Sequence, residues 1–256
     1  MPIKYIFFLI LLIPFAHIKA ENAPSQIEIY LLIGQSNMAG RGKIDAESIE
    51  TDSKVLSFNK QDKWEPAKDP LHFDKPTMVG VGPGLAFGKA MAKAYPGNLV
   101  GLVPCAYGGT SIKNWSSDSS IYKEAVRRTR LAMKNGKLKG ILWHQGEADF
   151  AQAERLKTYA EDLAKLISQL RKDLQGSEIP FVASELADFD VKKSAMVQQF
   201  NDILHGLEKS VPNYACINAE QLHDKDGIHL DTASARELGR RYSVAILQFN
   251  KSNPIK

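Results

Sequence analysis

Ser36 stands where an apolar run gives way to small and polar residues. The segment "IEIYLLIGQSNMAGRG" begins as a stretch that is apolar on both faces, which is typical of a central strand in a parallel sheet. Ser36 is then expected at the carboxyl end of that strand, the edge where open α/β sheets place their sites. A serine hydroxyl becomes a nucleophile only when a base takes its proton, and otherwise such a serine often caps a helix. The chemistry therefore depends on a histidine elsewhere in the chain.

His229 is the candidate base. The segment "DGIHL" places Asp226 three residues before it, and at that separation a turn can bring the carboxylate to Nδ1 and leave Nε2 free to accept a proton. A turn that only reverses the chain explains the same pattern. A metal site is a further alternative, because four possible ligands fall within seven residues: His223, Asp224, Asp226 and His229. The chain has no motif such as H-E-x-x-H, so we expect no metal.

Groups that could stabilise an oxyanion follow two other predicted strands. Gly108 and Gly109 lie in "PCAYGGTS", and glycine allows a main-chain N–H to approach a substrate closely. Gln145, in "WHQGE", offers a side-chain donor, and Glu147 adds a carboxylate in the same turn. An ordinary turn, solvation of a strand end or helix capping explains each segment taken alone. Nucleophile, base and oxyanion donors together indicate acyl transfer.

The elements that must position these residues alternate along the chain. Short apolar runs alternate with amphipathic stretches, which predicts a parallel sheet with helices on both faces. The carboxyl ends of its strands meet at one edge, so the four segments should converge there. The stretch from 41 to 82 is mostly irregular. We expect strands near 26–33, 55–58, 99–105, 139–144, 180–186 and 214–218, and helices near 83–95, 121–135, 151–174, 193–209 and 232–248.

The N-terminus predicts export. "MPIKYIFFLILLIPFAHIKA" has a lysine, an apolar run too short to span a membrane and small-residue cleavage positions, so we expect a signal peptide over residues 1–20, cleaved near Ala20. An uncleaved anchor is the alternative. Residues 21–256 suit one domain with a full core, since 44% of the chain is hydrophobic and 24% is charged. The protein is then secreted or periplasmic, with no membrane partner in its mature form.

The net charge argues against binding of nucleic acid, and the setting of the two cysteines argues against a disulfide. Loss of Lys4 and Lys19 with the signal peptide reduces the formal charge from +4 to +2, which gives no electrostatic case for nucleic acid. Cys105 and Cys216 each lie in a short apolar run, and we expect buried free thiols in preference to a disulfide.

The motifs together resemble a known family. The segments "GQSNMAGRG", "PCAYGGTSIKNW", "WHQGEAD" and "DGIHL", in this order, resemble the acetylesterases of carbohydrate esterase family six and the related sialate O-acetylesterase domain, within the SGNH hydrolase superfamily. The similarity runs from about residue 26 to 249. It implies a flavodoxin-like three-layer α/β/α domain with a central parallel sheet, which removes acetyl groups from carbohydrates through an acetyl-enzyme without a cofactor.

The resemblance also assigns roles. Ser36 matches the nucleophile and His229 the base. The oxyanion donors are the N–H of Ser36, the N–H of one glycine of "GGT" and the side chain of Gln145, the glycine being Gly108 or Gly109. "HQGE" replaces the G-x-N-D of the wider superfamily, so Glu147 becomes a second candidate, beside Asp226, to orient His229.

The sugar is less well specified. Trp115, six residues after Gly109, is expected to stack on a sugar ring, whereas Trp143 is expected in the core. Arg41 is a candidate cation for a sialic acid carboxylate, and a solvated loop arginine without that role is the alternative. We expect an acetylated oligosaccharide or polysaccharide, as for an acetylxylan esterase; the alternatives are a sialate O-acetylesterase, a lipase or phospholipase of the same superfamily, and a carbohydrate-binding protein without activity.

Overall fold

A seven-stranded sheet forms the centre of the computed structural model, which describes residues 26–189 and 194–252. The signal peptide expected over residues 1–20 lies outside the described residues. The strand order is β3-β2-β4-β1-β5-β6-β7, and every neighbouring pair is parallel except β2 and β3. The strands are β1 (Ile27–Gly34), β2 (Val55–Phe58), β3 (Trp64–Pro66), β4 (Leu99–Pro104), β5 (Gly136–His144), β6 (Phe181–Ser184) and β7 (Tyr214–Ile217).

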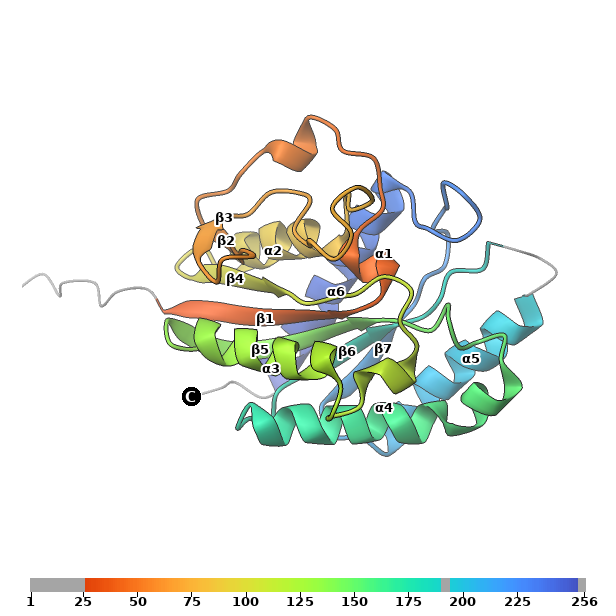
Figure 1. The fold of residues 1–256 in the computed structure, drawn as a ribbon. Coiled ribbons are helices and arrows are strands. Elements are labelled where there is room, and N and C mark those ends of the chain that lie inside the picture. The colour runs from red at the N-terminus through yellow and green to blue at the C-terminus, as the bar shows by residue number, and fades with distance from the viewer. Residues whose placement is uncertain (1–25, 190–193, 253–256) are drawn as a thin grey trace, which may run out of the picture.

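Helices cover both faces of this sheet (Figure 1). Helices α2 and α6 pack on one face, and α3, α4 and α5 pack on the other. The predicted three-layer α/β/α fold is therefore confirmed. The helices are α1 (Ser36–Ala39), α2 (Pro83–Ala94), α3 (Ser120–Ala132), α4 (Ala153–Asp173), α5 (Ser194–Gly206) and α6 (Thr232–Ser252), with short 3-10 turns η1 (Glu47–Ile49), η2 (Ile112–Trp115) and η3 (Leu207–Lys209).

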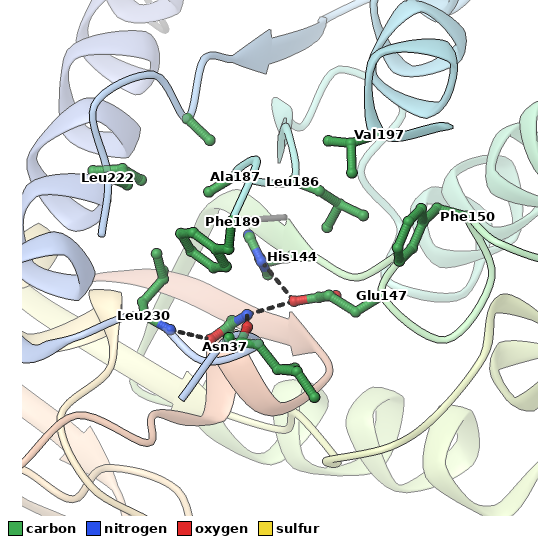
Figure 2. Close-up of a pocket in the computed structure, with 13 residues that line it drawn as sticks. Asn37, His144, Glu147, Phe150, Leu186, Ala187, Phe189, Val197, Leu222 and Leu230 are labelled. Atoms are coloured by element: carbon green, nitrogen blue, oxygen red, sulfur yellow. Dashed lines mark hydrogen bonds and ion pairs between the residues drawn. The ribbon is translucent and has the colours of Figure 1, made fainter. Parts of the chain in front are cut away.

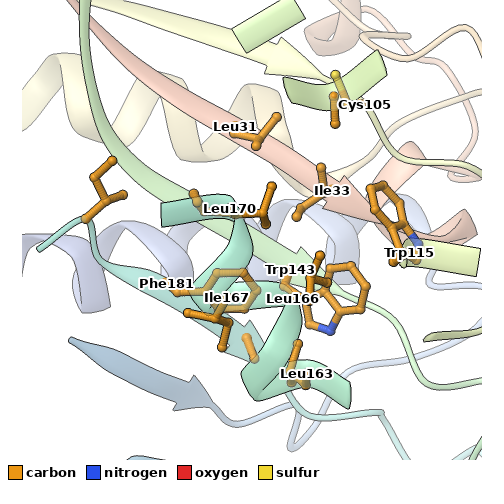
Figure 3. Packing of buried hydrophobic residues seen from close by; sticks show 14 of the residues in the cluster. Leu31, Ile33, Cys105, Trp115, Trp143, Leu163, Leu166, Ile167, Leu170 and Phe181 are labelled. Atoms are coloured by element: carbon orange, nitrogen blue, oxygen red, sulfur yellow. The ribbon is translucent and has the colours of Figure 1, made fainter. Parts of the chain in front are cut away.

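Strand β1 is buried on both faces, as its sequence predicts. Ile29, Leu31 and Ile33 point into the cluster beneath α3 and α4, and Tyr30 and Leu32 point into the cluster beneath α2 and α6. On the first face, the leucines of α4 pack against β5 and β6 (Figure 3). Each fully buried aliphatic side chain contributes roughly 1.5–3 kcal/mol relative to exposure. The strand that leads into Ser36 is thus one of the most firmly held parts of the fold.

Both cysteines are free. Cys105 is buried just after β4, and Cys216 lies partly buried in β7. Burial raises the pKa of the Cys105 thiol to about 12, so this thiol stays protonated. The expectation of free thiols is confirmed, whereas the expected burial holds for Cys105 and only in part for Cys216. Among the described residues, no helix is both long and apolar enough to cross a membrane.

Candidate active site

Ser36 lies where β1 ends and α1 begins. The main-chain N–H of Gln35 donates to the carbonyl of His144 at 2.8 Å, which joins the end of β1 to the end of β5. Ser36 is the first residue of α1, so its N–H has no carbonyl one helical turn earlier to bond. Its side chain is nearly buried, and among the described residues its hydroxyl has no hydrogen-bond partner. Both polar groups of Ser36 therefore remain available to a substrate.

His229 and Asp226 lie in the loop between β7 and α6 and contact each other as their spacing predicts. The distance from His229 Nδ1 to Asp226 Oδ2 is 2.9 Å, and the main-chain N–H of His229 donates to Asp226 Oδ1 at 2.8 Å. Desolvation opposes ionisation of Asp226, but the hydrogen bonds from His229 outweigh it and lower the pKa of this carboxyl below its usual range. Asp226 is thus an ionised acceptor that fixes the orientation of the imidazole ring.

Asn37 connects the serine to the histidine loop. Its side-chain Oδ1 accepts from the main-chain N–H of Leu230 at 2.9 Å, and its Nδ2 donates to the carbonyl of Ile228 at 3.1 Å. These are the two residues that flank His229. The residue after the candidate nucleophile therefore grips the main chain on both sides of the candidate base, a contact that the sequence analysis did not anticipate.

Glu147 orients this clamp instead of contacting His229. Glu147 Oε1 accepts from Asn37 Nδ2 at 2.5 Å and lies 3.1 Å from His144 Nε2 (Figure 2). His144 Nδ1 is hydrogen-bonded to Ser184 Oγ. Desolvation raises the pKa of Glu147, but attraction to His144 and these hydrogen bonds produce a net lowering. The expectation that Glu147 is a second partner of His229 is corrected by these contacts. Its carboxylate is held by Asn37 and His144.

A buried ion pair supports the glycine turn on the other side of Ser36. Asp74 Oδ2 accepts from the N–H of Gly108 at 2.7 Å and from Arg41 Nη2 at 2.9 Å, and the side chains of Arg41 and Asp74 are each 2% exposed. Desolvation opposes ionisation of Asp74, but the bonds from Gly108 and Arg41 lower its pKa overall. Gly109 is exposed, with a φ of 82°, and its N–H has no partner among the described residues. Gly109, and not Gly108, therefore keeps a free donor.

Gln145 does not have the free amide that an oxyanion donor needs. The side chain is fully buried, and its Nε2 lies within hydrogen-bond distance of Gln35 Oε1, the Thr110 carbonyl and Asp149 Oδ2, at 3.0, 3.0 and 2.6 Å. An amide group has only two protons to donate, so these acceptors use them both. Asp149, which competes with a substrate for the amide, was not expected from the sequence.

Two predicted sugar contacts are corrected in the same way. Trp115 is 1% exposed, and its ring packs edge-on against Trp143 with 5.4 Å between centroids, so it has no face for a sugar. Trp143 is buried in the core, as predicted. Arg41 is buried against Asp74 and cannot reach a sialic acid in this structure. The nearby cation on the surface is Lys75, whose Nζ lies 3.8 Å from where a Cβ on Gly109 would stand.

The alternative metal site has no matching geometry. Within residues 26–189 and 194–252, no group of three or more His, Cys, Asp or Glu side chains is arranged to hold a metal ion. Asp224 instead accepts from the main-chain N–H of Gly227, and Asp226 is engaged by His229. His223 is exposed at the surface. These contacts make a turn that presents His229.

The mostly parallel sheet with helices on both faces places the chain in the α/β class. The sequence profile of the family described as "Carbohydrate esterase, sialic acid-specific acetylesterase" matches residues 26–248. The chain belongs to this family and is an esterase, as the resemblance of its four motifs predicts.

Related proteins agree with this assignment. A probable carbohydrate esterase of Arabidopsis thaliana is 34% identical over 250 residues, which cover 90% of this chain and 93% of that protein. A crystal structure of an Arabidopsis thaliana protein superposes with a TM-score of 0.80 at 33% identity, covering 88% of this chain and 99% of that one. A carbohydrate acetylesterase from Xanthomonas citri gives a TM-score of 0.65 at 18% identity, over 89% of this chain and 57% of that one. This last similarity shows the fold alone.

Proposed function

We propose that the protein is a serine esterase that removes O-acetyl groups from carbohydrates through an acetyl-enzyme, in the manner of an acetylxylan esterase. One observation carries the proposal: Asn37, the residue after Ser36, holds both neighbours of His229, whose Nδ1 lies on Asp226. The clamp ties the loop of the base to the residue after the nucleophile, and Asp226 orients the imidazole ring within that loop. Names of relatives, among them a carbohydrate acetylesterase from Xanthomonas citri, support the choice of substrate class.

The reaction follows from the roles of these groups. His229 Nε2 takes the proton of Ser36 Oγ as Oγ attacks the acetyl carbonyl carbon, and the tetrahedral oxyanion accepts hydrogen bonds from the N–H groups of Ser36 and Gly109. Collapse breaks the bond to the sugar oxygen, which leaves with the proton from His229. Water then attacks the acetyl-enzyme with His229 as base, releasing acetate and restoring Ser36. Catalytic hydrogen bonds are often long before substrate binds, which accounts for a Ser36 hydroxyl without a protein partner.

Covalent labelling tests the nucleophile. A serine-directed phosphonate should modify Ser36 alone, as mapped by mass spectrometry, and Ser36→Ala should lower acetate release by roughly 10⁴-fold or more. The exposed Ser117 supplies the matched control, Ser117→Ala, which should keep full activity. Labelling of a different serine, or substantial turnover by Ser36→Ala, would refute the assignment.

A substrate panel tests the sugar. Ester hydrolysis, measured by titration of the released acid, should be fastest with acetylated xylan, slower with O-acetylated sialic acid and slowest with a long-chain ester, because a long acyl chain requires a broad apolar entrance and an acetyl group does not. A ranking led by the long-chain ester would favour a lipase. Binding of acetylated xylan without any acetate release would favour a carbohydrate-binding protein.

A sialic acid substrate is the second candidate, and Lys75 is the observation that favours it. Its ammonium lies beside Gly109, and it forms no ion pair with the described residues. If the carboxylate of a sialic acid binds there, Lys75→Gln should raise KM for O-acetylated sialic acid about tenfold and leave KM for acetylated xylan unchanged. Equal effects on both substrates would remove Lys75 from this role.

Export is the remaining part of the proposal. The predicted signal peptide would deliver the mature chain, beginning near Glu21, to the periplasm or the medium, where acetylated polysaccharides are accessible. N-terminal sequencing of protein recovered outside the cytoplasm should begin at or within a few residues of Glu21. An intact Met1 in an active protein of the cytoplasm would contradict export.

A further inference from the structure

A cavity of about 150 Å³ lies behind the loop that carries His229. Its walls come from the carboxyl ends of β5, β6 and β7 and from α5, and the loop residues Gly227 and Ile228 close one side. Neither Ser36 nor His229 lines it, but their chain neighbours Asn37, Ile228 and Leu230 do, so the cavity adjoins the site of ester cleavage. Open α/β sheets commonly bind ligands in a crevice at this edge.

Most of the cavity wall is apolar. Side chains from four segments face it, including Phe150, Leu186, Val197 and Leu222 (Figure 2). An engineered apolar cavity of similar volume binds benzene, which sets the scale of a ligand that such a space accommodates. The cavity therefore suits a molecule built on a single small ring.

One end of the cavity is polar, and two of its three polar residues are fully engaged. Asn37 uses Nδ2 for Glu147 and Ile228 and Oδ1 for Leu230, while both ring nitrogens of His144 have partners. These side chains have no hydrogen-bonding capacity that a ligand must satisfy.

Glu147 differs from its two neighbours. Oε1 accepts two hydrogen bonds, but Oε2 is buried and has no partner among the described residues. An ionised carboxylate can only accept hydrogen bonds, and leaving one of its oxygens buried without a donor is unfavourable. The polar end of the cavity thus lacks one donor.

We propose that this cavity is a binding site for a small molecule with one apolar ring and one hydrogen-bond donor, either a hydroxyl or an ammonium group, which bonds to Glu147 Oε2. The ring would occupy the space between Phe150, Val197 and Leu222, and the donor would point toward the Asn37 end. The site goes beyond the esterase activity and does not rest on Ser36 as the nucleophile. A ligand with an anionic head group would meet the Glu147 carboxylate and be excluded.

Four probes of nearly equal size test the chemistry: benzylamine, benzyl alcohol, toluene and benzoate. Binding is measured by calorimetry and ligand-observed NMR on the Ser36→Ala variant, so the result is independent of turnover. We expect benzylamine and benzyl alcohol to bind with Kd near the millimolar range, about tenfold or more tightly than toluene, because each supplies the missing donor. Benzoate should not bind. Nuclear Overhauser contacts should link the bound ring to the methyl groups of Ile228 and Leu222.

Two variants locate the site. Ala187→Leu should fill part of the cavity and abolish binding, whereas Ala94→Leu, on the exposed end of α2, should leave it unchanged. Glu147→Gln should remove the preference for benzylamine over toluene, and it remains informative if Ala187→Leu fails to fold. Toluene binding as tightly as the donors, binding that Ala187→Leu does not affect, or competitive inhibition of ester hydrolysis in the wild-type enzyme would overturn the proposal.

Discussion

Different interactions support the two sides of Ser36: neutral hydrogen bonds on the side of the base and a buried ion pair on the side of the oxyanion donors. On the base side, a neutral amide, Asn37, holds the loop of His229, and the acid that orients the ring is 41% exposed. On the oxyanion side, Arg41 and Asp74 form an ion pair that is 2% exposed and holds Gly108. An amide clamp loses hydrogen bonds when it is broken, whereas a buried ion pair leaves a charge without a partner. A substitution on the base side should therefore lower activity with little loss of stability, whereas a substitution on the oxyanion side should lower both activity and the stability of the fold.

The largest expected effect lies on the base side. Asp226→Asn should lower kcat about 10⁴-fold, as loss of the orienting acid does in a serine triad, because the amide favours the wrong tautomer. Glu147→Gln should cost far less, since Glu147 contacts Asn37 and His144 and not His229. Both kcat values would come from acetate release at saturating substrate. The reverse order would make Glu147 the orienting acid and would contradict the observed contacts.

This contrast also explains what the sequence could and could not predict. Asp226 and His229 are three residues apart, so a turn brings them together without help from the rest of the fold. Asp74 lies in the irregular stretch from 41 to 82. A buried Arg41 requires an anionic partner, but the positions of the carboxylates along this stretch do not identify which of them pairs with it. Local pairs were predictable, and pairs made by tertiary packing were not.

The same distinction holds for the fold. The six predicted strands and five helices are present because each carries its own hydrophobic period and a length that fits. Strand β3 was missed, since three residues at a sheet edge are too short for a period, and α1 was missed within the Ser36 motif. Trp115 was expected at the site because it lies only a few residues after Gly109. Instead, η2 packs on α4 and β5, and this packing directs the ring of Trp115 into the core.

The next largest effect concerns the oxyanion side. Asp74→Asn should lower kcat about 10²-fold with little change in KM, because a displaced Gly108–Gly109 turn misplaces a donor that acts only in the transition state. It should also destabilise the protein by roughly 3–5 kcal/mol, since Arg41 is left buried and unpaired. Steady-state kinetics and urea unfolding measure the two effects.

A second variant separates them. Arg41→Met combined with Asp74→Asn removes both charges, so it should recover much of the lost stability but little of the lost kcat. Glu161→Gln, which breaks an exposed pair with Lys165 on α4, is the control and should change neither quantity appreciably. Recovery of kcat together with stability would show that the ion pair supports the fold without positioning the turn.

A smaller effect should follow when the base-side clamp is removed. Asn37→Ala deletes three hydrogen bonds and frees the loop on both sides of His229, so kcat should fall about 10- to 100-fold through misplacement of the ring. Stability should change by only about 1–3 kcal/mol. The rate of phosphonate labelling at Ser36 should fall in parallel with kcat. The control Gln198→Ala, on the exposed face of α5, should leave both rates intact, and unchanged labelling in Asn37→Ala would mean that the loop holds its position unaided.

The last expected effect concerns the dependence of stability on pH and not the catalytic rate. The loop that supplies Asp74 also contains Asp69, which is 3% exposed; burial raises its pKa to about 7, although Arg236 opposes the shift. An ordinary aspartate in the unfolded chain titrates near about 3.9, so between about pH 4 and 7 the folded protein binds a proton that the unfolded chain does not. Stability from this group is complete below about pH 4 and is lost as pH rises through 7, by at most about 4 kcal/mol.

Asp69→Asn imitates the protonated acid, so its Tm should match that of the wild type at pH 4 and exceed it increasingly up to pH 8. Asp226→Asn is the counterpart on the base side: the pKa of Asp226 is lowered, so any stability that it contributes is present at neutral pH and lost only at strongly acidic pH. A Tm difference for Asp69→Asn that stays constant from pH 4 to 8 would show that Asp69 ionises normally and that the two sides of Ser36 respond alike to pH.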